Sequence, residues 1–162
     1  MRMDTVCIET TVVGHLAGRL HPDPAIAARQ RVTRDWWRDE ARNFEVTISQ
    51  VVLDECGAGD PSAAAERLEV VDGIDLLESS GEVDALADAL IRGKAIPPSE
   101  PRDAFHIAIA AVHGVKYLLT WNFKHIANAT LRSRIENICR DAGFVPPTIC
   151  TPDELAGADD GH

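Results

Sequence analysis

Short apolar runs alternate along the chain with longer segments in which apolar residues recur at helical spacing. The runs that predict strands cover residues 6–8, 44–48, 74–77, 117–120 and 148–150. They are almost continuously apolar, which is typical of strands in a parallel sheet that is covered on both faces. The pattern therefore predicts a sheet whose two sides are both buried.

The segments between these runs predict helices. Their apolar positions predict helices over residues 25–43, 61–71, 81–93, 101–112 and 131–142, and a further helix begins near Ser49. Asp60 followed by Pro61 is a typical helix start, because Asp accepts from free N–H groups and Pro has none to satisfy. Strands that alternate with helices indicate an α/β fold with an open parallel sheet between helical layers.

The length of the chain indicates a single domain. At 162 residues and 45% hydrophobic content it has enough material for one substantial core. We predict one domain over residues 1–156, without internal repeats or linkers. Residues 157–162 are small, polar and acidic, and we expect them to be a disordered tail.

Nothing in the sequence indicates a membrane or an oxidising compartment. No apolar stretch approaches the ~20 residues that cross a bilayer, and the first residues do not resemble a signal peptide. The four cysteines, at positions 7, 56, 139 and 150, are scattered rather than paired. This spacing favours reduced, buried thiols over a zinc site, and a cytoplasmic location.

The net charge of −10 argues against a generic nucleic-acid binder. Proteins that hold the phosphate backbone usually present Lys and Arg to it. Acidity is compatible with a nucleic-acid substrate if carboxylates hold a divalent metal, or if a local basic rim lies on an acidic surface. It also favours a basic partner protein.

Four polar residues fall where an α/β sheet binds ligands, beyond the carboxyl ends of its strands. Glu9 follows the first predicted strand and Asn122 follows residues 117–120. Glu55 lies about two turns into the helix that follows the second strand, and Asp103 lies in the first turn of its helix. The sequence therefore predicts that these four side chains meet at one end of the sheet.

Carboxylates at such a position are typical of a site for Mg²⁺ or Mn²⁺, which prefer oxygen ligands. Without a cation, crowded carboxylates repel each other and resist ionisation. Taken one at a time, the residues have simpler explanations: Asp103 favours the helix dipole, Glu55 suits an exposed helix position, and Asn122 is a common turn former. The prediction rests on the set, and on Glu9 in an apolar segment.

The carboxy-terminal half carries the clearest family signature. The run DAFHIAIA at residues 103–110, followed by VKYLLTWNFKH at 115–125, closely resembles PIN domains of VapC-like toxins. Residues 8–13 resemble the first strand of that family, and residues 49–55 resemble the segment that carries its second carboxylate. The ending TPDEL at 151–155 is also similar, so the resemblance covers roughly residues 4–156.

The resemblance implies a three-layer α/β/α PIN-like fold with a five-stranded parallel sheet. It also implies an endoribonuclease dependent on Mg²⁺ or Mn²⁺, the toxin of a type II toxin–antitoxin pair, which forms a homodimer and is restrained by a cognate antitoxin. By position, Glu9, Glu55 and Asp103 are the catalytic carboxylates and metal ligands, with Asn122 as a fourth ligand. Thr10 is expected to orient the first carboxylate or a water molecule on the metal.

Two positions depart from the family pattern. Glu9 stands where Asp is commoner, and Asn122 is neutral where many members have a further Asp. Three carboxylates suffice for one ion but weaken the case for two, so low activity is one expectation. The alternative is a PIN module without catalysis that acts in protein contact or RNA binding. A phosphatase or receiver-like domain is disfavoured, because it needs an Asp nucleophile after the first strand.

The remaining candidates have two interpretations each. His106 lies one helical turn after Asp103 and either contacts substrate or a carboxylate, or is held within the core. Residues Arg102, Lys124 and His125 form an RNA-binding rim or serve solubility. The neighbouring tryptophans at 36 and 37 form a dimer or antitoxin interface or pack on the core.

Overall fold

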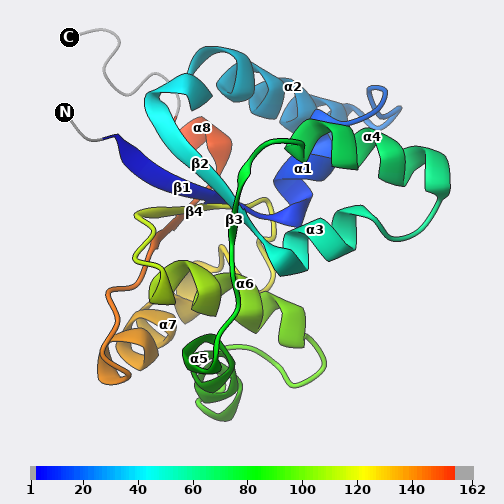
Figure 1. Cartoon of the computed structure of the whole chain (residues 1–162). Helices are drawn as coiled ribbons and strands as arrows, with labels where there is room; N and C mark the ends of the chain where they lie inside the picture. The colour runs from blue at the N-terminus through cyan, green and yellow to red at the C-terminus, as the bar shows by residue number, and fades with distance from the viewer. Residues whose placement is uncertain (1–2, 156–162) are drawn as a thin grey trace, which may run out of the picture.

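The computed structural model describes residues 3–155, and these form a five-stranded sheet in which all neighbouring strands are parallel (Figure 1). The strand order is β3-β2-β1-β4-β5. The strands are β1 (Asp4–Ile8), β2 (Phe44–Ser49), β3 (Asp75–Leu77), β4 (Tyr117–Leu119) and β5 (Thr148–Cys150). The predicted α/β class, with a five-stranded parallel sheet, is confirmed.

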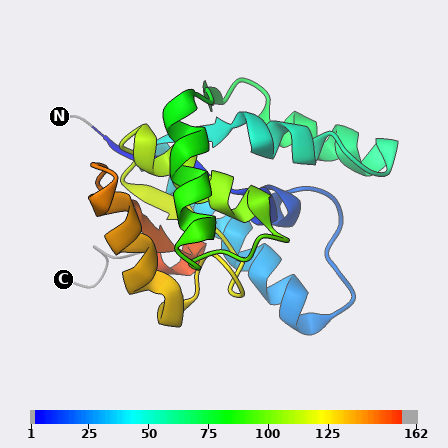
Figure 2. The same ribbon diagram turned by 90° about the horizontal axis from the view of Figure 1, so that it is seen from below.

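Helices cover both faces of this sheet, as in a three-layer α/β/α fold (Figures 1 and 2). The helices are α1 (Thr10–Leu16), α2 (Pro24–Asp39), α3 (Gln50–Cys56), α4 (Pro61–Val71), α5 (Gly81–Arg92), α6 (Pro101–Val112), α7 (Ala129–Asp141) and α8 (Pro152–Leu155), with a 3₁₀ turn η1 (Ala41–Asn43). Helices α5, α6 and α7 pack on one face, and α1, α2 and α8 pack on the other. Among the described residues, no helix is long and apolar enough to cross a membrane.

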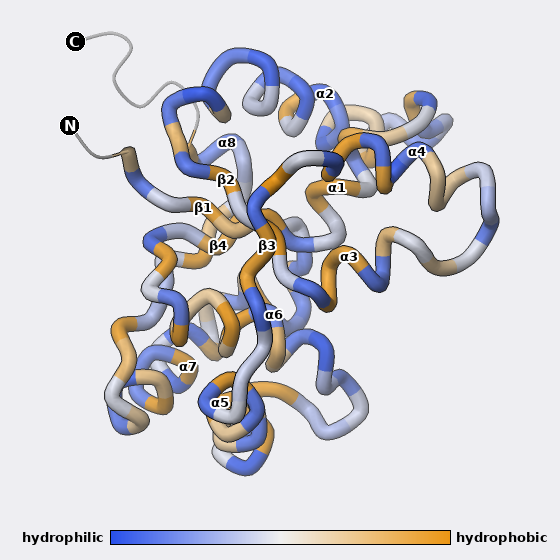
Figure 3. The backbone as a smooth tube through the Cα atoms, in the orientation of Figure 1, coloured by the Kyte–Doolittle hydropathy of each residue, from blue (hydrophilic) through white to orange (hydrophobic). Residues whose placement is uncertain are grey.

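Successive residues of β1, β4 and β5 point into different cores. In β1, Cys7 packs with α5–α7, whereas Val6 and Ile8 pack with α1 and α2. The same alternation divides Leu118 from Leu119 in β4. Because side chains alternate along a strand, a strand buried on both faces must be apolar at every position. Figure 3 shows the result as an apolar centre where the strands meet the helices.

The stretch at residues 8–13, which resembles a strand, is a strand only at its first residue. β1 ends at Ile8, and Glu9 is the N-cap residue of α1, with extended backbone angles. Val12 and Val13 are buried as part of this helix. An apolar, β-branched run of this length cannot be assigned from periodicity alone, and contacts of α1 with α2, α3 and α4 favour the helix.

The predicted helix over residues 25–43 is shorter than expected. α2 begins at Pro24, where the Asp23 side chain accepts from Ala25 N–H, and it ends at Asp39 before the 3₁₀ turn. Trp36 is 1% exposed and packs against Phe44, so it belongs to the core and not to an interface. The expected tail at 157–162 lies outside the described residues.

The strand order places β1 at a switch point. From β1 the sheet extends through β2 and β3 on one side, and through β4 and β5 on the other. In open α/β sheets, ligands bind outside the carboxyl ends of the strands where the order reverses. The carboxyl ends of β1 and β4 are therefore the place where a site is expected.

The buried cysteines allow a test of the fold. All four thiols are free and buried, and burial raises the pKa of Cys7 and of Cys150 to about 12. Because the thiolate is the nucleophile, the thiol form that persists at pH 8 is unreactive. We expect iodoacetamide to leave the native protein unmodified at pH 8 and to alkylate all four cysteines in denaturant, as measured by mass spectrometry. Rapid labelling of Cys7 in the native protein would contradict this core.

Candidate functional site

Glu9 lies at the switch point, at the carboxyl end of β1. Its backbone N–H donates to Leu119 O at 3.0 Å, which continues the pairing of β1 with β4 by one residue. The side chain is only 4% exposed, and its Oε1 accepts hydrogen bonds from the hydroxyls of Thr11 and Thr120. A buried carboxylate is costly unless it is hydrogen-bonded in this way, so the hydroxyls keep Glu9 in place.

His106 on α6 lies between two of the predicted carboxylates. Its Nε2 is 3.1 Å from Glu55 Oε1 and 3.9 Å from Glu9 Oε2, and the side chain is 2% exposed. The two interpretations of this histidine are thus both partly right, because it is held within the packing and it also contacts carboxylates. It connects α6 to the ends of β1 and α3.

Glu55 on α3 is the more accessible of this pair, with 20% of its side chain exposed. The Thr10 hydroxyl donates to Glu55 Oε1, so Thr10 positions the second carboxylate and not the first. Its other predicted role, orienting a water molecule on a metal, stays a prediction. Burial acts to raise the pKa of Glu55, but hydrogen bonds with His106 and Thr10, and the charges of His106 and Arg102, hold that pKa below its ordinary value. Glu55 therefore favours its charged form.

Asp103, Asn122 and His125 form the second half of the site. Asp103 Oδ1 accepts from Asn122 Nδ2 at 3.2 Å, and Asp103 Oδ2 lies 2.8 Å from His125 Nδ1. Asn122 Oδ1 accepts from the His125 backbone N–H at 3.1 Å. All three side chains are half-buried, and α6 and the loop after β4 supply them.

Thr120 joins the two halves. Its hydroxyl donates to Glu9 Oε1 at 2.6 Å and accepts from the Asn122 backbone N–H at 2.9 Å. Asp103 and His106 lie one turn apart on α6, which forms a second connection between the halves. The four residues that the sequence predicts to meet, Glu9, Glu55, Asp103 and Asn122, are thus linked through His106 and Thr120 at the carboxyl ends of the strands.

A tighter group of possible metal ligands lies at the outer edge of the site. Ligand atoms of Glu100, Asp103 and His125 all lie within 4.8 Å of one another. The sequence predicted Asp103 as a ligand, but it placed His125 in an RNA-binding rim or among residues that serve solubility, and it did not single out Glu100. Glu100 lies three residues before Asp103, at the N-cap position of α6, and this spacing is the signal that would have indicated it.

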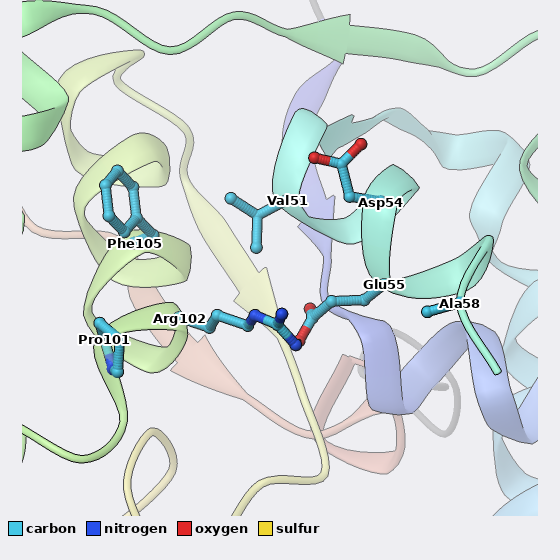
Figure 4. A pocket seen from close by; sticks show the side chains of 7 residues that line it. All are labelled: Val51, Asp54, Glu55, Ala58, Pro101, Arg102 and Phe105. Atoms are coloured by element: carbon cyan, nitrogen blue, oxygen red, sulfur yellow. The ribbon is translucent and has the colours of Figure 1, made fainter.

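The predicted basic rim is only partly assembled. Arg102 reaches from α6 to Glu55 on α3, with Nη1 at 3.7 Å from Glu55 Oε2, across a hollow of about 270 Å³ (Figure 4). Its side chain is 71% exposed, so it borders the carboxylates and still faces solvent. Among the described residues, Lys124 is exposed and takes no part in the hydrogen bonds that link the site.

The donors that converge closely enough to hold a metal ion are those of Glu100, Asp103 and His125. Carboxylate oxygens are ligands that Mg²⁺ and Mn²⁺ prefer. His125 adds an imidazole nitrogen, which is more typical of Mn²⁺ and later transition metals than of Mg²⁺. The arrangement can therefore hold a cation beside a partly exposed surface.

Comparison of the sequence with protein-family models and with curated proteins finds no match.

Replacing Thr120 by Val tests the link between the two halves. Val is nearly isosteric, but it removes the donor to Glu9 and the acceptor for Asn122 N–H, and Thr120 is fully buried. We expect the free energy of unfolding in urea to fall by about 2 kcal/mol, the usual cost of unpaired buried polar groups. The matched variant Thr148→Val, at an exposed strand position, should change it by no more than about 0.5 kcal/mol. Equal losses in both would count against the link.

The lowered pKa of Glu55 predicts a pH dependence. Because the folded-state pKa lies below the ordinary value of 4.5, ionised Glu55 contributes stability above that value, and the contribution is lost as the pH falls through the folded-state pKa. In metal-free protein, carbon NMR should show the Glu55 carboxyl titrating below pH 4.5. Thr10→Val removes one donor and should move the midpoint upward, whereas Thr148→Val should not. An unchanged midpoint in Thr10→Val would exclude the hydroxyl as a cause.

Proposed function

We propose that the chain is a metal-dependent endoribonuclease of the PIN type, resembling VapC-like toxins, which hydrolyses RNA phosphodiester bonds with Mg²⁺ or Mn²⁺. The family assignment rests on the motifs at residues 103–110 and 115–125. The five-stranded parallel sheet between helical layers is the fold that this resemblance implies. The proposal extends to a cytoplasmic homodimer restrained by an antitoxin, for which the net charge of −10 favours a basic partner.

One observation carries the proposal. Glu9 is a nearly buried carboxylate at the switch point of the sheet, and it is linked through His106 to Glu55 and through Thr120 to Asn122 and Asp103. Carboxylates are seldom buried together for stability alone, since each resists leaving water. A cluster drawn from residues 9 to 122 at this end of the sheet is better explained as a site for a cation.

Each residue of the site has a separate role in the proposed reaction. Glu9, Glu55 and Asp103 would hold the ion, and Asn122 would add its amide oxygen. A bound Mg²⁺ or Mn²⁺ would supply Lewis-acid chemistry, which offsets phosphate charge and makes nearby water more acidic. Thr10, Thr11 and Thr120 hold the carboxylates in fixed positions through their hydroxyls.

Arg102 has the position of a phosphate-binding residue. It is exposed, it lies beside Glu55, and its guanidinium has more donors than the Glu55 contact uses. Contacts to phosphate orient RNA without reading its bases, so Arg102 would position the backbone against the carboxylates. The same contact offsets part of the negative charge that would otherwise repel the substrate.

Replacing Asp103 by Asn tests the proposed activity. Asp103 contacts both Asn122 and His125, and Asn keeps its size while removing the charge. We expect Mn²⁺ binding, measured by calorimetry, and cleavage of labelled RNA both to fall by about a hundredfold or more, since even outer partners of metal ligands contribute about 10–100-fold. The matched control is Asp84→Asn, an exposed carboxylate in the first turn of α5, which should leave both unchanged.

The same experiment distinguishes the ribonuclease from the alternative, a PIN module without catalysis. A protein that binds no Mn²⁺ and cleaves no RNA, with Asp103→Asn indistinguishable from the wild type, would contradict the ribonuclease. The neutral Asn122, whose amide already donates to Asp103, is the observation that favours a non-catalytic module. In that case the site would serve only to hold α6 against the loop that follows β4.

A further inference from the structure

An aromatic pair lies directly beside the acidic site. Trp121 and Phe123 flank Asn122 in the loop after β4, with ring centroids 6.0 Å apart. The Arg29 guanidinium, from α2, lies 5.6 Å from the Trp121 ring centroid and 5.1 Å from that of Phe123. Phe123 is 46% exposed, so part of its ring faces solvent beside the acidic site.

A hollow opens next to this pair, between α1, α2 and the loop. Its volume is about 460 Å³, within the range of small-molecule sites, and it is lined by both apolar and polar groups. The lining residues are Thr11, Gly14, His15, His21, Ile26, Arg29, Gln30 and Trp121.

The hollow and the acidic site share a wall. The Thr11 hydroxyl donates to Glu9 Oε1 and accepts from the Trp121 backbone N–H at 2.8 Å. Trp121 itself lies between Thr120, which donates to Glu9, and Asn122, which donates to Asp103. A ligand in the hollow would therefore contact Thr11, which is bonded to a carboxylate, and Trp121, which is next in sequence to residues that contact the carboxylates.

The walls of the hollow are held in place before any ligand arrives. Trp121 Nε1 donates to Thr33 Oγ1 at 2.8 Å. Gln30 accepts from His21 N–H and donates to Arg19 O. Because these side chains already have partners, little conformational freedom would be lost on binding.

The charges of the hollow differ from those of the protein as a whole. Within residues 3–155, Arg29 forms no ion pair, so its charge is available to a ligand. Burial, and the charges of Arg29 and Arg34, lower the pKa of His15, which is therefore neutral at pH 7 and offers one donor and one acceptor. Cationic, aromatic and neutral hydrogen-bonding groups thus line one small space.

We propose that this hollow binds a nucleobase of single-stranded RNA, next to the phosphate that lies at the carboxylates. The inference rests on the proposed function and adds the position of the neighbouring nucleotide. The base would lie against the Trp121 ring and the Arg29 guanidinium, which both line the hollow. Phe123 does not line it, but its exposed ring lies 5.1 Å from the same guanidinium and would extend the aromatic surface on which bases of single-stranded RNA stack. Because every base has an aromatic face, the site would accept RNA without strict sequence selection.

The test measures RNA binding separately from RNA cleavage. A fluorescein-labelled single-stranded RNA octamer is titrated with the Asp103→Asn protein in Mn²⁺, so that binding is followed by anisotropy without cleavage. Adding Phe123→Ala or Arg29→Gln should raise the Kd about tenfold, which means weaker binding. The controls Val145→Ala, an exposed apolar residue elsewhere, and Arg31→Gln, an exposed arginine on the same helix, should change it by less than about twofold.

Each outcome decides the inference. Phe123 is exposed, so Phe123→Ala should keep the thermal melting temperature of its parent, and a loss of affinity then reports on binding. Equal affinities of the hollow variants and the controls, or no RNA binding by the parent, would overturn the inference. If the hollow variants bind weakly and the wild type cleaves no RNA, the proposed ribonuclease fails while the base site stands.

Discussion

The structure around the site depends on the burial of one carboxylate, that of Glu9. A charged group in this position is tolerated only where donors surround it, and each donor comes from a different element. Thr11 donates from α1 and Thr120 donates from the residue after β4, while His106 of α6 lies 3.9 Å from Glu9 Oε2 and 3.1 Å from Glu55 Oε1. The requirement to satisfy Glu9 therefore fixes the relative positions of the segments that carry Glu55, Asp103 and Asn122.

The same centre explains how so acidic a chain could accept a nucleic-acid substrate. Two of the exposed arginines lie beside the carboxylates or the rings next to them. Arg102 borders Glu55 on one side, and Arg29 lies over Trp121 and Phe123 on the other. A cation held by the carboxylates would add positive charge for the RNA phosphate, and the rings of Trp121 and Phe123 would offer an aromatic surface to the base.

Much of the fold, and part of the site, could be predicted from the sequence. The five predicted runs correspond to the five strands, most clearly at β1, β4 and β5, because residues buried on both faces of a sheet leave an apolar signal without alternation. The place of Glu9 and Asn122 could be predicted because each follows the end of a strand, and parallel strands end at the same edge of the sheet. Helix α1 was not predicted because residues 8–13 resemble a strand, with β-branched side chains at the four positions after Glu9. The carboxylate that Thr10 contacts is the second and not the first, because that helix turns its hydroxyl toward Glu55.

The sequence by itself determined the alternation of strands and helices, the parallel sheet and the end of the sheet at which the polar residues meet. These follow from local periodicity and from the direction in which each strand runs. Only the tertiary structure decided which groups touch: that His106 lies between Glu9 and Glu55, that Glu100 joins Asp103 and His125, and that Arg29 reaches the rings beside Asn122. Such contacts join residues far apart in the chain, and their distances depend on how the helices pack, which no local pattern records.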